Sequence, residues 1–168
     1  SFHVDLSNKV AVVTGGGGVL CGCMARCLAS CGAKVAVADL REDAAEAVAQ
    51  TITAAGGTAI GVACNVLEPE SLQTASAHIE QALGTVDILV NGAGGNHPKG
   101  TTSREYLLPD DLSGTIEDLT TFFDLDQDGI QFVFNLNVLG TLLPTQVFAR
   151  GMAERAGGTI VNISSMNA

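Results

Sequence analysis

The sequence predicts an α/β fold in which helices cover both faces of a parallel sheet. Short apolar segments rich in Val and Ala alternate along the chain with longer segments of helical character, and glycine clusters separate them. Hydrophobic residues make up 46% of the 168 residues but aromatic residues only 4%, so small aliphatic side chains must build the core. This composition suits a sheet that is buried on both faces.

Each element follows from an apolar pattern and its boundaries. Five apolar runs that end in turn residues are predicted to be strands: Lys9–Thr14, Lys34–Asp39, Thr58–Cys64, Val86–Asn91 and Gly158–Ser164. The segments between them are predicted to be helical: Val19–Ser30, Ala44–Ala55, Glu70–Leu83, part of Phe122–Asn137, and Leu139–Arg155. Strands that alternate with helices of this length imply parallel pairing through right-handed crossovers. The length fits one domain, residues 1–168.

One region breaks the alternation. Residues 92 to about 121 are rich in Gly, Thr, Pro and Asp, and no helix or strand pattern runs through them. We interpret residues 95–121 as an insertion, because a loop of this length in a compact domain usually has a function or is mobile.

Charge and cysteine content narrow the class of protein. The net charge is −10 and there is no basic stripe, which argues against a nucleic-acid partner. We expect Lys, Asp or Glu to interrupt every apolar run before it reaches membrane-spanning length, and we see no signal peptide at the first residues. The five cysteines are an odd number, and four of them are crowded into positions 21–31 in and directly after one predicted helix, so a disulfide framework is not indicated and a cytoplasmic location is expected.

The glycine cluster after the first predicted strand carries the first functional signal. A strand that leads through glycines into a helix places backbone N–H groups and the positive helix end against a pyrophosphate. Asp39 ends the second strand, where a carboxylate can accept both hydroxyls of an adenosine ribose. This pattern favours NAD over NADP, although Arg41 is a residue that could bind a 2′-phosphate. The simpler alternative is an ordinary tight turn with a solvated Asp39.

The chain here resembles the short-chain dehydrogenase/reductase family, which has a Thr-Gly-x-x-x-Gly-x-Gly turn. Thr14 and Gly15 match, whereas Val19 and Cys21 occupy the second and third glycine positions. Four later segments resemble family motifs in the family's order. They are Asn65-Val66, Asn91-Gly92-Ala93-Gly94 (Asn-Asn-Ala-Gly in the family), Asn137-Val138-Leu139-Gly140, and Ile163-Ser164-Ser165.

The resemblance implies a Rossmann fold and assigns functions to individual residues. Ser165 matches the family's catalytic serine, and Asn137 matches the asparagine that holds a water in a proton relay. The residues that would contact the cofactor are Gly15, Gly17, Gly18, Val19, Leu20, Asp39, Leu40, Asn65, Val66, Asn91, Gly92, Ala93, Gly94 and Ile163. The family usually assembles as homodimers or homotetramers, partly through the helix predicted at Leu139–Arg155.

The family's Tyr-x-x-x-Lys motif, which supplies the acid/base and the lysine that lowers its pKa, has no match. The only tyrosine is Tyr106, and the only lysines are Lys9, Lys34 and Lys99. We therefore expect a Rossmann fold whose C-terminal strands and helices are missing, and a chain that binds nucleotide without turnover. The alternative is a non-catalytic nucleotide-binding module.

Several longer stretches resemble the sugar-acid branch of the family, the D-mannonate (D-fructuronate) oxidoreductases. They are GAGGNHPKG, FFDLD, NVLGTLLPTQVF and ISSMNA. This implies a sugar-acid substrate. Asn96, His97 and Lys99 are candidate substrate contacts, and Arg104 is a further cation that could hold a carboxylate. The alternative is a solvated loop with an incidental basic pair.

Two patterns that suggest metal sites have simpler interpretations, and we predict no metal site. Asp124-x-Asp126-x-Asp128-Gly129 opens like a calcium loop but lacks its twelfth-position Glu, so a capped acidic turn is expected. Cys23, Cys27 and Cys31 share one helical face, and we expect them to pack on the sheet as small residues.

Overall fold

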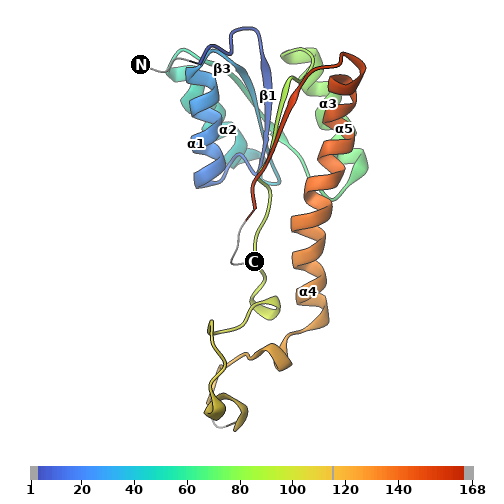
Figure 1. Ribbon diagram of the computed structural model, residues 1–168. Helices are drawn as coiled ribbons and strands as arrows, with labels where there is room; N and C mark the ends of the chain where they lie inside the picture. Colours follow the sequence, from blue (N-terminus) through green and yellow to red (C-terminus); the bar gives the residue numbers. More distant parts are fainter. Residues whose placement is uncertain (1–3, 115, 165–168) are drawn as a thin grey trace.

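A computed structural model of the protein describes residues 4–114 and 116–164 and contains a five-stranded parallel sheet (Figure 1). The strands are β1 (Val10–Thr14), β2 (Lys34–Asp39), β3 (Thr58–Ala63), β4 (Ile88–Asn91) and β5 (Thr159–Asn162). The helices are α1 (Val19–Ser30), α2 (Glu42–Ala54), α3 (Pro69–Ala82), α4 (Gln127–Phe134) and α5 (Gly140–Glu154). The architecture is a Rossmann α/β fold, as predicted.

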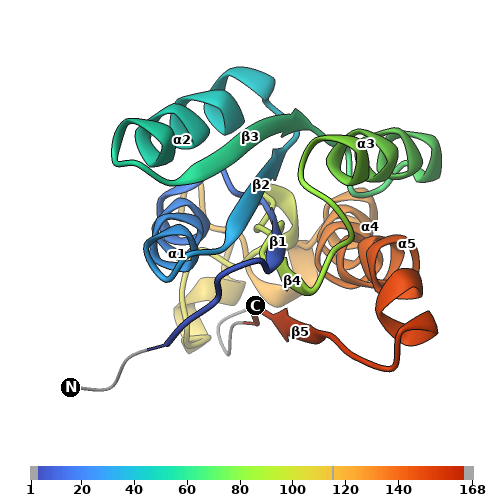
Figure 2. The same ribbon diagram turned by 90° about the horizontal axis from the view of Figure 1, so that it is seen from above.

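Helices cover both faces of the sheet and give it three layers. Helices α1 and α2 lie on one face and α3 and α5 on the other (Figure 2). Side chains alternate along β1: Val10 and Val12 enter the core under α3 and α5, whereas Ala11 and Val13 enter the core under α1 and α2. Because both faces are buried, every residue of β1 is apolar except Thr14 at its end.

The strand order β3-β2-β1-β4-β5 determines where a ligand can bind. Along the chain, β2 pairs with one side of β1 and β3 pairs with β2. Helix α3 then connects β3 to β4, which pairs with the other side of β1. The connections that follow β1 and β4 therefore diverge to opposite faces, which leaves a crevice at the carboxyl ends of these two strands. In open α/β sheets this switch point is where ligands bind.

Most element boundaries agree with the sequence. Strand β2 and helix α1 have the predicted limits, and α2 begins at Glu42, two residues earlier than expected. Acidic side chains at Glu42 and Asp43 suit the positive end of that helix. Helices α1 and α2 are each followed by a glycine with positive φ, Gly32 and Gly56, which lets the chain leave the helix without a Cβ clash.

Helices α4 and α5 form one continuous 28-residue helix, Gln127–Glu154, through a π-helical segment at Asn135–Leu139. The expectation that charges interrupt every apolar run is wrong here, because no charged residue occurs from position 129 to 149. By length and composition this helix could cross a membrane. However, its α5 part packs against the sheet, where Phe148 and Met152 are buried.

The insertion contains two short 3-10 turns, is followed directly by a third, and extends beyond the carboxyl edge of the sheet (Figure 1). The turns in and beside it are η1 (Pro98–Gly100), η2 (Pro109–Leu112) and η3 (Phe122–Asp124). Inside the insertion, Arg104 Nη1 lies 2.7 Å from the buried Asp111 Oδ1. Arg104 is thus paired within the insertion, which argues against the prediction that it holds a substrate carboxylate.

The acidic turn caps a helix, as predicted. Asp126 Oδ1 accepts hydrogen bonds from the backbone N–H groups of Asp128 and Gly129 at the start of α4. Asp124 accepts hydrogen bonds from the backbone and side chain of Thr121 before η3, and these bonds lower the pKa of its carboxyl group.

The prediction that three cysteines pack on the sheet is wrong. Cys23 and Cys27 are exposed and Cys31 is half-buried. The face of α1 that packs on the sheet carries Cys21 and Ala25 instead. The spacing of Cys23, Cys27 and Cys31 correctly placed them on one face of α1. It could not show which face of α1 packs on the sheet, because two faces of this helix carry small residues.

Candidate functional site: a dinucleotide cleft at the switch point

The turn after β1 leaves the N-terminal end of α1 open. Gly15 has φ of 65°, a left-handed conformation that favours glycine, and Gly18 caps α1 without a side-chain hydrogen bond. The next residue, Val19, is 93% exposed and projects from the first turn. Free N–H groups and the positive helix end at this position can bind an anion such as a pyrophosphate.

Asp39 at the end of β2 lies directly against this turn. Its Oδ2 accepts a hydrogen bond from Gly17 N at 3.0 Å, and its Oδ1 accepts one from Arg41 N at 3.0 Å. A Cβ on Gly17 would lie 2.7 Å from Ala44 Cβ, so the close approach needs glycine. Asp39 is only half-buried, which leaves the carboxylate accessible to ribose hydroxyls beside the pyrophosphate position. Leu40, which follows, is exposed.

Thr14 joins the ends of β1 and β4. Its Oγ1 accepts hydrogen bonds from Gly92 N at 3.1 Å and Ala93 N at 3.2 Å, and the hydroxyl donates to Val90 O at 3.5 Å. On the other side of the same turn, the Cys21 thiol donates to Gly92 O at 3.6 Å. The segment that follows β4 is therefore held against the glycine turn and the start of α1.

A cleft of about 600 Å³ opens at this junction, which is within the usual size range of small-molecule sites. It lies between the glycine turn, the segment after β4, the π-helical segment and the end of β5. The residues that line it are Leu20, Gly92, Ala93, Gly94, Gly95, Asn96, Asn137, Ile163 and Ser164. Sequence reasoning did not select Gly95 or Ser164, although both stand next to predicted residues.

Asn137 reaches the cleft from the π-helical segment. Its Oδ1 accepts from Gly95 N at 3.0 Å, and its Nδ2 donates to Gly95 O at 2.9 Å. A Cβ on Gly94 would lie 2.7 Å from the same Oδ1, so a larger residue there would displace the Asn137 amide. The structure thus shows Asn137 holding the cleft wall, while its predicted function in a proton relay remains a prediction.

Asn91 has a different environment from that expected of a cofactor contact. It is 2% exposed and does not line the cleft. Its Nδ2 donates to Thr145 Oγ1 and to Asn162 Oδ1, both at 2.9 Å. It therefore joins β4 to α5 and β5, and its Oδ1 has no hydrogen-bond partner among the described residues.

Asn65 and Val66 lie beyond β3, on the Asp39 side of the sheet. The residue before them, Cys64, donates its backbone N–H to Asp39 O at 2.8 Å. Asn65 Oδ1 accepts from Leu67 N at 3.1 Å, which fixes the side chain in a local turn, and Val66 is buried. Both residues lie at the carboxyl edge of the sheet but outside the 600 Å³ cleft.

The candidate substrate residues separate into two groups. Asn96 lines the cleft, whereas His97 and Lys99 do not. His97 Nδ1 accepts from Lys99 N at 3.2 Å, and its ring packs against Phe132 with centroids 5.1 Å apart. Ser165, the predicted catalytic serine, lies outside the described residues.

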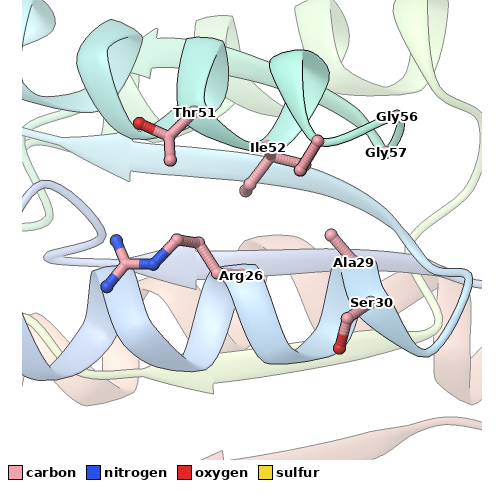
Figure 3. A pocket seen from close by; sticks show the side chains of 8 residues that line it. Arg26, Ala29, Ser30, Thr51, Ile52, Gly56 and Gly57 are labelled. Carbon is pink, nitrogen blue, oxygen red and sulfur yellow. The ribbon is translucent and has the colours of Figure 1, made fainter.

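Two further observations concern alternative sites. A hollow of about 300 Å³ lies between the C-terminal ends of α1 and α2, at the opposite edge of the sheet, with Arg26 and Ile52 beside it (Figure 3). Its hydroxyls, Ser30 and Thr51, donate to carbonyls of their own helices, so it offers few free polar groups. Within residues 4–114 and 116–164, no group of three or more His, Cys, Asp or Glu side chains is placed to hold a metal ion.

Comparison with known proteins identifies the family. The model of the short chain dehydrogenase family matches residues 9–168. An uncharacterized oxidoreductase of Haemophilus influenzae is 52% identical over 164 residues, which are 98% of this chain and 56% of that protein. The uncharacterized oxidoreductase UxuB of Bacillus subtilis is 44% identical over 170 residues, covering 99% of this chain and 58% of that protein.

A solved structure agrees with these relatives. The crystal structure of a candidate D-mannonate oxidoreductase from Haemophilus influenza, with bound NAD, has a TM-score of 0.89 and 50% identity. The match covers 97% of this chain and 57% of that chain. This chain therefore spans a little over half the length of the proteins it matches. It belongs to the short-chain dehydrogenase family.

Proposed function

We propose that this chain forms the dinucleotide-binding part of an NAD-dependent oxidoreductase that interconverts a sugar-acid ketone and its alcohol. One observation carries the proposal: Asp39, Gly17 and the open end of α1 lie in direct contact beside the cleft at the β1–β4 switch point. This arrangement fits the adenosine ribose, the pyrophosphate and the nicotinamide in that order. The similarity to a solved relative with bound NAD supports it.

The preference for NAD over NADP follows from charge. Backbone N–H groups of Gly17 and Arg41 orient the Asp39 carboxylate, which would accept hydrogen bonds from the 2′- and 3′-hydroxyls of the ribose. A 2′-phosphate would meet this negative charge at close range. Arg41 is exposed and lies two residues after Asp39 in the sequence, where its guanidinium could pair with a 2′-phosphate. NADP binding is therefore expected to be weaker than NAD binding rather than absent.

Bound NAD would supply hydride transfer to or from the substrate carbon. The groups of this chain that we assign to the reaction are Ser165, which would orient the substrate oxygen, and Asn137, which holds the cleft wall and would take part in a proton relay. The 168 residues contain no Tyr-x-x-x-Lys motif to complete the acid/base pair. We therefore propose that this chain binds NAD but does not turn over substrate.

A sugar acid is the proposed substrate class. The similarity to a candidate D-mannonate oxidoreductase supports this class. Asn96 lines the cleft and is the candidate substrate contact best placed to donate hydrogen bonds to hydroxyl or carboxylate groups. His97 and Lys99 lie next to α4 and do not line the cleft. We propose that they orient Asn96 or contact the distal end of the substrate.

We also propose a cytoplasmic homodimer or homotetramer. Apolar side chains that are exposed along α4, the π-helical segment and α5 support an assembly through this helix; they are Phe132, Phe134, Val138, Leu139 and Leu142. All five cysteines are free thiols, which agrees with a reducing compartment.

A non-catalytic nucleotide-binding module remains the second candidate, favoured by the missing Tyr-x-x-x-Lys motif. Reading the coding sequence beyond position 168 for that motif separates the two candidates. Isothermal titration of the 168-residue chain tests the binding that both share: NAD should bind at least tenfold more tightly than NADP. Failure of both nucleotides to bind at millimolar concentration would overturn the proposal.

A further inference from the structure

We propose that the Cys21 thiol fills the space that a side chain at position 92 would occupy, and that this packing positions the wall of the cleft against the glycine turn. Cys21 is then a positioning residue for the nicotinamide half of the dinucleotide. This inference rests on the proposed NAD function. Both residues depart from the family motifs described above: cysteine replaces a glycine at 21, and glycine replaces an asparagine at 92. The structure places these two departures in contact.

The contact leaves no room for a side chain at position 92. A Cβ built on Gly92 would overlap the Cys21 Sγ, and its next neighbour would be Thr14 O at 3.0 Å. Gly92 is not among the glycines with positive φ, so its backbone conformation does not itself require glycine. The requirement for glycine at 92 therefore comes mainly from the thiol.

The thiol is a fixed part of this junction. Cys21 is 5% exposed, on the face of α1 that packs against the sheet. Burial, followed by the nearby charge of Asp39, raises the pKa of the Cys21 thiol, so the group is protonated and can donate to Gly92 O at 3.6 Å. Gly92 is thus held on two sides, by Thr14 Oγ1 at its N–H and by Cys21 Sγ at its carbonyl.

Gly92 begins the segment 92–96 that lines the cleft. A shift at Gly92 would move this whole wall relative to Leu20 and the open end of α1. It would leave the Asp39–Gly17 contact in place, because that contact forms on the β2 side of the turn. The pair should consequently control binding of the nicotinamide half and leave binding of the adenosine half almost unchanged.

A mutant cycle tests the pair: C21G, G92A and C21G/G92A, titrated with NAD and with AMP. G92A should lower NAD affinity at least tenfold and AMP affinity less than threefold. C21G/G92A should recover at least fivefold of the NAD loss, because the added methyl group then occupies the volume of the missing thiol. Equal losses of NAD and AMP affinity, or a double variant no better than G92A, would overturn the pairing.

Cys23 provides the matched control, because it lies on the same helix but is exposed. C23G costs the same loss of helix propensity as C21G and should not rescue G92A. If G92A fails to fold, the double variant decides. A C21G/G92A protein that folds and binds NAD supports the pairing. A C21G/G92A protein that does not fold, although C21G alone folds, overturns the pairing. If the wild-type chain does not bind NAD, the proposed function fails. The pair is then judged from the thermal midpoints of the nucleotide-free variants, where additive changes would refute it.

Discussion

The side-chain amide of Asn137 forms two hydrogen bonds with the backbone of Gly95, 42 residues earlier in the chain. Gly95 N donates to Asn137 Oδ1 at 3.0 Å, and Asn137 Nδ2 donates to Gly95 O at 2.9 Å. The pairing joins the wall of the cleft to the π-helical segment between α4 and α5. The helix that contains α5 is thereby tied to the segment that lines the cleft.

Replacing Asn137 with Ala should loosen this wall. Two hydrogen bonds are lost, which should lower the free energy of unfolding by about 1–2 kcal/mol, and the Gly95 amide should exchange with solvent more rapidly. Urea unfolding and hydrogen exchange measure the two effects. Asn135→Ala is the control, because Asn135 Oδ1 accepts a hydrogen bond from Gln131 Nε2 at 2.8 Å within the same helix and does not bond to the cleft wall. Equal effects of the two substitutions would contradict a special function for the Gly95 contact.

Replacing Asp39 with Ala should weaken NAD binding more than NADP binding. The substitution removes the proposed acceptor for the ribose hydroxyls and the acceptor of the Gly17 N–H, at a cost of about 1.5–3 kcal/mol, or roughly 10- to 150-fold in affinity. NADP should lose less, because the repulsion of its 2′-phosphate also disappears. Calorimetric titration with both nucleotides gives the ratio.

Asp43→Ala is the matched control for Asp39. Asp43 is an exposed acid in the first turn of α2, so its removal changes the net charge equally without touching the glycine turn. NAD affinity should change less than twofold. A loss similar to that of Asp39→Ala would mean that general electrostatics, and not the contact with Gly17, governs binding.

Replacing Arg104 with Ala should unfold the insertion locally while the sheet stays intact. The Asp111 side chain is 2% exposed, and its other hydrogen-bond donor among the described residues is the backbone N–H of Leu108 at 2.9 Å. Leaving a buried carboxylate without its cationic partner strongly lowers the stability of the structure around it. Limited proteolysis should therefore cut residues 100–121 faster, with the thermal midpoint of the sheet almost unchanged.

The exposed pair of Arg150 and Glu154 supplies the comparison for Arg104. Both side chains are largely exposed on α5, so Arg150→Ala should cost less than about 0.5 kcal/mol and leave proteolysis of the insertion unchanged. If Arg104→Ala lowered NAD affinity as strongly as proteolytic resistance, the insertion would be coupled to the cleft rather than locally stable.

The fold was predictable wherever local pattern and tertiary structure agree. Gly18 and Gly32 flank helix α1, and the charged residues Lys34 and Asp39 bound the apolar run of β2, so both elements are marked in the sequence, and the structure reproduces them. The continuity of α4 and α5 was not predictable in this way. The sequence predicts two separate helices that meet near position 138, and the structure joins them through the π-helical segment at Asn135–Leu139.

The candidate site was predictable where it depends on short spacing. The position of Asp39 relative to the glycines is set by one β-α-β unit, so the contact with Gly17 follows from the sequence. The pairing of Asn137 with Gly95, and of Arg104 with Asp111, depends on the path of the insertion, which no periodic pattern describes. The same limit explains why Asn96 lines the cleft and His97 does not.

The stability of the protein should fall between about pH 9 and pH 11 because of Cys64. Burial raises the pKa of this thiol from its ordinary value of 9.0 to about 11. The folded state then holds a proton that the unfolded chain has already released. Stability is fully present below pH 9 and is lost as the pH rises toward 11, by about 1–2 kcal/mol. Denaturant titrations at pH 8, 9, 10 and 11 measure this slope.

Cys64→Ala should flatten that slope, because alanine cannot ionise, although it costs some packing at every pH. Val62→Ala is the control: Val62 is buried in the same core cluster as Cys64, so its truncation costs packing but removes no ionisable group and should leave the wild-type pH dependence unchanged. An identical slope in Cys64→Ala and the wild type would show that other groups, such as lysines that lose their charge in this range, cause the alkaline loss of stability.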